Sequence, residues 1–196
     1  MDREEVRQEL RSFEKEIMLR KASSDRLCAM IYNFPQILAE YPDLQQETFN
    51  VWEKVAESKQ NSRYSVEDTY SSLNNVMLKD KNTVPQAFGV YTKTLASHEN
   101  DYETLCLAQE TLLVIAQSNS AFAGKAAQAF NKALDRYEES ITPKTPLKKF
   151  FQRLHDVNGK VDFEKKNIQK MREDAKRFLP QKTPIVASKS RSVLLL

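Results

Sequence analysis

The chain of 196 residues contains only three glycines, Gly89, Gly124 and Gly159. Average usage is roughly 7 %, and sheets joined by tight turns normally need glycine where the backbone adopts positive φ. This low glycine content therefore favours long helices over strands. Because 40 % of the residues are apolar, there is enough material for a core, and the sequence predicts an all-α protein.

Apolar residues recur in steps of four and three through the N-terminal part of the chain, as they do along one stripe of a helix. The stripe extends from Asp2 to Phe34 and is interrupted only by Arg20 and Ser24. Pro35 is expected to bend or stop this first helix. The apolar members of the stripe are Val6, Leu10, Phe13, Ile17, Leu27, Ile31 and Phe34.

Two shorter helices are predicted downstream of it. Asp43 follows Pro42 directly and is placed to cap a helix that ends at about Lys59. Ser65 and Asp68 resemble a capping arrangement for the next helix. That helix is expected to end near residues 78–82.

The longest regular pattern lies in the middle of the chain. Thr83 and Pro85 form a helix start signal, and apolar residues then keep a heptad-compatible spacing from Phe88 to Tyr137. A single helix over 84–138 would have about 55 residues and would be ~80 Å long at 1.5 Å per residue. Its weak point is the segment 97–100. The pattern predicts an elongated bundle of long amphipathic helices in antiparallel, coiled-coil-like packing.

Pro143 and Pro146 mark a short connector toward the C-terminus. Beyond it, apolar residues from Leu147 to Phe178 define a final amphipathic helix. From residue 180 onward the mixture of Pro, Ser, Lys and Arg is typical of a flexible tail. The predicted regions are therefore N-terminal helices over 1–80, a long helical hairpin over 83–179 and a flexible basic tail over 180–196.

Positive charge is concentrated near the C-terminus. Residues 141–196 contain fourteen Lys and Arg against five Asp and Glu, a net charge of +9, whereas residues 1–140 carry −6. The whole-chain value of +3 hides this difference. The basic part is expected to seek an acidic partner, which is an acidic phospholipid surface, an acidic protein or a nucleic acid.

Most of these cations fall on the predicted final helix, opposite its apolar stripe. Near an anionic membrane each contributes about 1 kcal/mol within a Debye length. The competing interpretation is a solvated helix whose lysines pair with the acidic N-terminal region. Nucleic acid is the weaker partner because few aromatic residues are placed to stack on bases. The predicted membrane-binding residues are Lys148, Lys149, Arg153, Lys160, Lys165, Lys166, Lys170, Lys176 and Arg177.

The sequence offers little for catalysis. His98 and His155 lie in different predicted helices without paired ligands, and no glycine-rich phosphate loop is present. Cys28 and Cys106 lie far apart within apolar patterns, which favours core positions over nucleophiles and a reducing compartment. We therefore expect no enzymatic activity, no cofactor and no metal site.

The N-terminus is charged and lacks an apolar signal core. No stretch of the sequence approaches the roughly 18 consecutive apolar residues that a membrane-spanning helix needs. A cytoplasmic protein, peripheral to the membrane, is the expectation.

Residues from about 100 to 178, under half of the chain, resemble a BAR domain of the endophilin and amphiphysin type. The resemblance implies a crescent-shaped antiparallel dimer whose basic face lies on curved, negatively charged membrane. The family's membrane-contact lysines would correspond to Lys160, Lys165, Lys166 and Lys170. The residues that carry the resemblance are Ala133, Leu134, Tyr137, Pro146, Leu147 and Phe150, followed by Lys160, Asp162, Phe163, Glu164, Lys165 and Lys166.

Two functional hypotheses follow from the sequence. The first is a non-enzymatic, dimeric protein that binds or scaffolds acidic membrane surfaces through its basic C-terminal helix, in membrane remodelling or trafficking. The second is a helical-bundle adaptor that binds another protein, with the basic helix paired internally.

Overall fold

The computed structural model describes residues 2–58, 62–97, 100–142 and 160–179. These ranges contain eight α-helices and no strand, so the all-α prediction is confirmed. Two short 3-10 helices, η1 (Pro42–Leu44) and η2 (Lys81–Thr83), join neighbouring helices. The α-helices are α1 (Arg3–Met18), α2 (Ser24–Glu40), α3 (Gln45–Glu57), α4 (Arg63–Lys79), α5 (Val84–Ser97), α6 (Tyr102–Ser118), α7 (Ser120–Ile141) and α9 (Lys160–Lys176).

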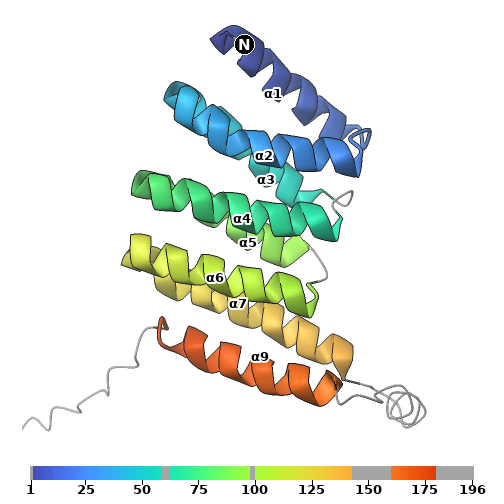
Figure 1. Cartoon of the computed structure of the whole chain (residues 1–196), viewed down its shortest axis with the longest axis vertical. Helices are drawn as coiled ribbons and strands as arrows, with labels where there is room; N and C mark the ends of the chain where they lie inside the picture. Colours follow the sequence, from blue (N-terminus) through green and yellow to red (C-terminus); the bar gives the residue numbers. More distant parts are fainter. Residues whose placement is uncertain (1, 59–61, 98–99, 143–159, 180–196) are drawn as a thin grey trace, which may run out of the picture.

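The helices stack in two layers (Figure 1). The even layer consists of α2, α4 and α6, and each packs on the next. The odd layer consists of α1, α3, α5, α7 and α9 in the same manner, and α9 also touches α6. Contacts between α2 and α3, α4 and α5, and α6 and α7 hold the layers together. The elongated molecule is thus a stack of helix pairs, the arrangement of an α-solenoid.

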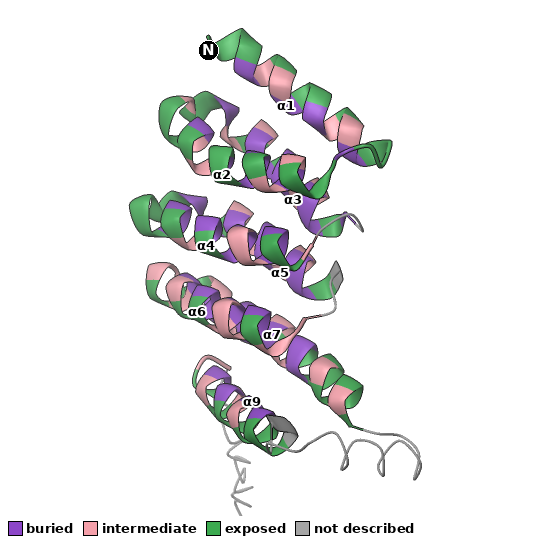
Figure 2. Cartoon of the chain, turned by 45° about the vertical axis from the view of Figure 1, so that its right-hand side comes forward, coloured by how far each residue is buried: buried purple, intermediate pink, exposed green. Residues whose placement is uncertain are grey.

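Buried residues face the space between the layers (Figure 2) and form one continuous core through the stack. Trp52 of α3 is its largest fully buried side chain. The Trp52 ring lies 5.1 Å from that of Phe34 in α2 and 5.8 Å from that of Phe49, between ring centroids. Aromatic pairs at these distances add to the stabilisation from apolar burial.

The predicted first helix is two helices. α1 begins with a capping box, in which Asp2 and Glu5 satisfy each other's backbone N–H groups. It ends at Met18, after which Arg20 adopts φ 54° and the chain reverses. Ser23 then caps α2. The two polar gaps in the sequence stripe therefore mark the break between two helices.

The proline and capping predictions for α2 and α3 were wrong in detail. Pro35 lies inside α2, which continues to Glu40. Asp43 lies in η1 and forms an ion pair with Arg3, while α3 begins at Gln45 without a side-chain cap. Proline tolerates this position because it removes only one backbone hydrogen bond, and the surrounding core holds the helix.

The predicted capping residue of α4 is displaced by one turn. Ser62 caps the helix, and its hydroxyl accepts from the backbone N–H of Ser65 at 3.4 Å. The predicted start signal of α5 is confirmed, since Thr83 precedes the helix and Pro85 lies in its first turn. The boundary predicted between residues 80 and 83 falls at η2, and helices from both sides of it pack on one another.

The prediction of one helix over 84–138 was wrong, because this stretch forms α5, α6 and α7. Asp101 caps α6 through the backbone N–H of Thr104 at 2.8 Å. Asn119 alone separates α6 from α7, and its side chain caps α7. Short reversals replace the ~80 Å rod that 1.5 Å per residue would give, so the elongated shape comes from stacking.

Two tyrosines cross the layers at the centre of the stack. The rings of Tyr70 in α4 and Tyr91 in α5 lie 6.1 Å apart, and both side chains are fully buried. The Tyr91 hydroxyl donates to the Ala108 carbonyl at 3.2 Å, whereas the Tyr70 hydroxyl has no hydrogen-bond partner among the described residues. Burial raises the pKa of both phenols.

This difference predicts opposite effects of the same substitution. Tyr91→Phe is expected to lower the free energy of unfolding by about 1 kcal/mol because a buried hydrogen bond is lost. Tyr70→Phe is expected to leave it unchanged or raise it by up to about 1 kcal/mol, since only a desolvated hydroxyl is removed. Urea unfolding at pH 7 measures both. Equal losses in the two variants would contradict the assignment of the Tyr70 hydroxyl as unbonded.

Candidate functional site: the basic face of α9

Helix α9 is the last helix of the described stack and docks through one apolar stripe. Ile168, Met171 and Ala175 are buried where α9 meets α7 and α6. Their spacing of three and four residues places them on one side of the helix. The opposite side of α9 is therefore turned outward.

A buried carboxylate extends this stripe toward the N-terminal end of α9. Glu164 is only 6 % exposed and accepts a hydrogen bond from the Tyr137 hydroxyl of α7 at 2.9 Å. Burial, together with this carboxylate, raises the pKa of the Tyr137 phenol. Buried carboxylates are costly unless they are hydrogen-bonded, so the position of Glu164 depends on the docking of α9 against α7.

Charged side chains fix the long side of α9 against its neighbours. Arg172 pairs with Asp135 at 2.6 Å and with Glu138 at 2.9 Å, both on α7. Gln109 of α6 donates to Asp174 at 3.3 Å. Arg172 is thus a positioning residue rather than a member of the outward surface.

The Tyr137 contact predicts a measurable stabilisation of α9. Tyr137→Phe is expected to lower the free energy of unfolding by about 1–3 kcal/mol, because Glu164 stays buried with one donor fewer. The matched control is Tyr32→Phe, which removes a hydrogen bond to Asp68 of 2.7 Å from a 64 % exposed side chain. Its expected effect is under about 0.5 kcal/mol. Urea unfolding of both variants decides, and equal effects would contradict the role assigned to Tyr137.

The outward side of α9 carries the lysines expected from the sequence. No ion pair joins Lys165, Lys166, Lys170 or Lys176 to another described residue, whereas Arg177 pairs with Asp174 at 3.2 Å. We name the following exposed residues the α9 basic face: Lys165, Lys166, Lys170, Lys176 and Arg177.

The remaining predicted residues are placed less fully. Lys148, Lys149 and Arg153 lie outside the described residues, as do His98 and His155. Lys160 begins α9, but its side chain is not among those described.

Two features of the α9 basic face were missed in the sequence. Phe163 is 61 % exposed, although its ring still lies 6.3 Å from that of Tyr102 between centroids. At 100° per residue, Phe163 shares one side of the helix with Lys166 and Lys170. The acids Asp162 and Glu173 are also exposed and lower the net charge of the face. The i, i+3, i+7 spacing of Phe163 with the lysines was the available signal.

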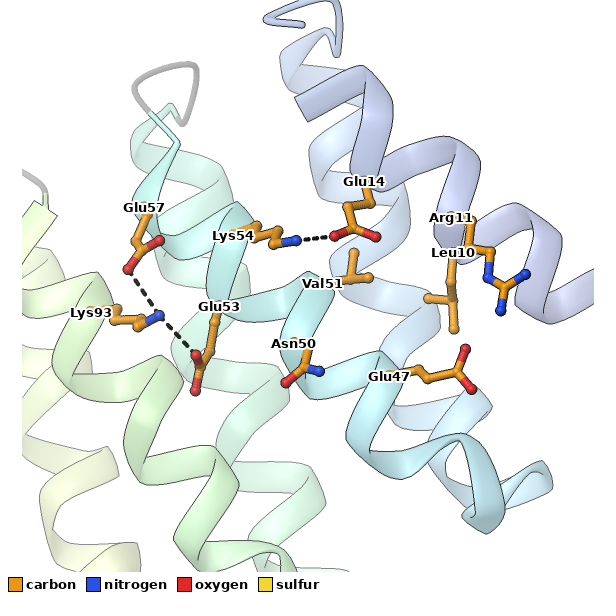
Figure 3. Close-up of a pocket in the computed structure, with 10 residues that line it drawn as sticks. All are labelled: Leu10, Arg11, Glu14, Glu47, Asn50, Val51, Glu53, Lys54, Glu57 and Lys93. Atoms are coloured by element: carbon orange, nitrogen blue, oxygen red, sulfur yellow. Dashed lines mark hydrogen bonds and ion pairs between the residues drawn. The ribbon is translucent and has the colours of Figure 1, made fainter. Parts of the chain in front are cut away.

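Cations elsewhere in the odd layer are used for internal pairing. A groove of about 330 Å³ crosses α1, α3 and α5 (Figure 3). Lys54 pairs with Glu14, and Lys93 pairs with Glu53 at 2.8 Å and Glu57 at 2.9 Å. The groove residues are Leu10, Arg11, Glu14, Glu47, Asn50, Val51, Glu53, Lys54, Glu57 and Lys93.

Hydrogen bonds to Glu53 and Glu57 raise the pKa of Lys93, so this lysine is firmly protonated at neutral pH. Gly89 makes the arrangement possible, because a Cβ at that position would overlap Glu53 Oε1. The groove is therefore an ion-pair network that joins three helices of the odd layer.

A double-mutant cycle tests the role of Gly89. In the interior of a helix, Gly89→Ala gains about 0.5–1 kcal/mol in helix propensity, but it displaces the Glu53 carboxylate from Lys93, a partly exposed pair worth about 0–1 kcal/mol. The net effect is expected to be near zero. In a Glu53→Ala background the full gain of about 0.5–1 kcal/mol should appear in urea unfolding. An identical effect in both backgrounds would contradict the overlap.

The two cysteines are half-buried, Cys28 in α2 and Cys106 in α6. Desolvation by burial is the main cause that raises the pKa of each thiol, which lowers the thiolate fraction. Among the described residues, no three His, Cys, Asp or Glu side chains gather as a metal site would require. Nor does any described helix combine the length and apolarity needed to cross a membrane.

Comparison with protein-family models, with curated proteins and with solved structures finds no match for this chain. These comparisons neither support nor refute the BAR-domain relationship, which stays a prediction.

Proposed function

We propose that this protein is a non-enzymatic scaffold that binds anionic membrane surfaces through the α9 basic face. The single observation that carries the proposal is the exposed Phe163 beside Lys166 and Lys170 on the outward side of α9. A phenyl ring next to lysines is the residue combination of helices that lie in the membrane interface. The ring enters the boundary between headgroups and acyl chains while the ammonium groups meet lipid phosphates.

The position of α9 suits such a contact. Its 17 residues form a rod of about 25 Å at 1.5 Å per residue. Docking uses only the stripe of Ile168, Met171 and Ala175, so the helix can lie lengthwise on a flat surface without unfolding. In that orientation the cations lie within the Debye length of about 8 Å at physiological salt.

Magnitudes favour weak, salt-sensitive binding. Each lysine near an anionic leaflet contributes about 1 kcal/mol, and the exposed acids Asp162 and Glu173 oppose part of this attraction. A single short signal of this kind gives reversible membrane association. Dimerisation, expected from the sequence, would double the number of contacts and belongs to the same proposal.

The alternative is an adaptor whose basic helix is neutralised internally. Only Arg172 supports it, through Asp135 and Glu138 of α7. No ion pair joins the four lysines of the α9 basic face to another described residue, and α1 lies at the opposite end of the stack (Figure 1). Internal pairing therefore accounts for one cation of α9 and leaves the lysines available for a partner.

Liposome co-sedimentation tests the membrane proposal. The protein should pellet with phosphatidylserine-rich vesicles, but not with phosphatidylcholine vesicles, at ~0.15 M salt, where the Debye length is about 8 Å. The variant Lys166→Glu/Lys170→Glu should lose this binding by charge reversal on the outward side of α9. Phe163→Ser should weaken it without changing net charge.

The matched control reverses two exposed lysines at the other end of the stack. Lys15→Glu/Lys21→Glu changes the net charge equally and should retain binding. Equal pelleting with neutral vesicles, or equal loss in both charge-reversal variants, would reject the proposal. Thermal unfolding of each variant checks that the stack remains folded.

A further inference from the structure

A second basic surface lies between α5 and α7, on the flank of the odd layer. It is a groove of about 250 Å³ whose charged residues are Lys125, Lys132 and Arg136 of α7. These residues are spaced at i, i+7 and i+11, which places them on one stripe of the helix over about 16 Å. We name this site the α5–α7 groove.

No carboxylate lines the α5–α7 groove among the described residues. Lys125 and Lys132 form no ion pair with another described residue. The neighbouring groove across α1, α3 and α5 differs in this respect, since Lys54 and Lys93 each meet a carboxylate there. The α5–α7 groove therefore presents cations without a countercharge.

Arg136 is held in place at one end of the groove. Its Nη2 donates to the carbonyl of Leu95, which also accepts from Asn100 Nδ2 at 3.2 Å. Leu95 lies in the last turn of α5, where helical carbonyls lack intrahelical partners. A guanidinium has five N–H donors, so this anchoring bond fixes Arg136 while most of its donors stay available.

The arrangement has an energetic cost that a ligand would remove. Lys132 and Arg136 are one turn apart, and like charges at this spacing destabilise a helix. Lys125 adds a third positive charge to the same stripe. An anionic ligand that spans the groove would relieve this repulsion and gain charge-assisted hydrogen bonds.

We propose that the α5–α7 groove binds an extended acidic peptide segment of a partner protein. Ala96 and Ala129 line the groove between the cations, and small side chains allow a peptide backbone to approach closely. The Gln128 amide, also in the lining, can bond to that backbone. An extended chain rises about 3.3 Å per residue with alternate side chains on one side. Five residues with acids at alternate positions therefore match the length of the stripe.

Charge and lining distinguish this ligand from other polyanions. No aromatic residue lines the groove, so nucleic-acid bases would find no stacking surface. A flat bilayer fits a groove between two helices less well than a single chain does. The inference goes beyond the proposed membrane function and does not depend on it, because the α9 basic face is a separate set of residues.

Fluorescence anisotropy with a labelled ten-residue peptide of alternating Glu and Ser tests the inference. Lys125→Glu/Lys132→Glu should weaken binding at least about tenfold, as expected for reversing two charged contacts. The matched control Lys166→Glu/Lys170→Glu reverses the same number of charges on α9 and should change affinity less than about twofold. Equal weakening by both variants would show attraction by net charge alone and overturn the proposal.

Two further arms keep the result decisive. Lys125→Gln/Lys132→Gln removes charge from exposed helix positions without adding any, and should weaken binding while thermal unfolding stays unchanged; retained affinity would overturn the proposal. A single-stranded oligonucleotide of equal charge should compete poorly. If it binds more tightly than the peptide and loses binding in the groove variant, the ligand is a nucleic acid and the peptide assignment is wrong.

Discussion

The structure depends on one constraint, which is that each helix has a single apolar stripe and cannot bury it alone. The α-helices range from 13 residues in α3 to 22 in α7, and isolated helices of such length are marginal in water. Stacking in two layers gives every stripe two or three neighbours and joins the stripes into one core. Stability is then shared between helix pairs and their interfaces, as in other stacks of this kind.

The sequence pattern predicted which residues face this core better than it predicted where the chain turns. Val6, Leu10, Phe13 and Ile17 are all buried as expected. The reversal after Met18 was missed because periodicity reports which side chains are apolar and contains no term for chain direction. Arg20 adopts positive φ without being glycine, so the usual glycine signal for a reversal was absent.

The break at Asn119 shows the same limit in a sharper form. One residue separates α6 from α7, and the apolar pattern continues across it almost without a gap. Asn is a strong N-cap residue because its side chain accepts from the first free backbone N–H groups. That preference is short-range, and a heptad-compatible pattern over fifty residues outweighed it. In the structure, the pairing of α6 with α7 stabilises the reversal.

The candidate site was predictable where it depends on one helix and unpredictable where it depends on two. Lys165, Lys166 and Lys170 are exposed because they lie opposite an apolar stripe, which the sequence shows. Glu164 was not predicted to be buried, since its hydrogen-bond partner Tyr137 comes from another helix. Only the docking of α9 against α7 brings them together.

Helix α7 explains why two basic surfaces at the same end of the stack remain separate. One side of it supplies Lys125, Lys132 and Arg136 to the α5–α7 groove. Asp135 and Glu138, on the side toward α9, pair with Arg172. These acids lie between the cations of α7 and those of α9 and reduce the repulsion between them. The charge asymmetry of the sequence is therefore divided by local pairing into two surfaces with different shapes, an exposed helix side and a groove, and a partner that fits one has no physical reason to occupy the other.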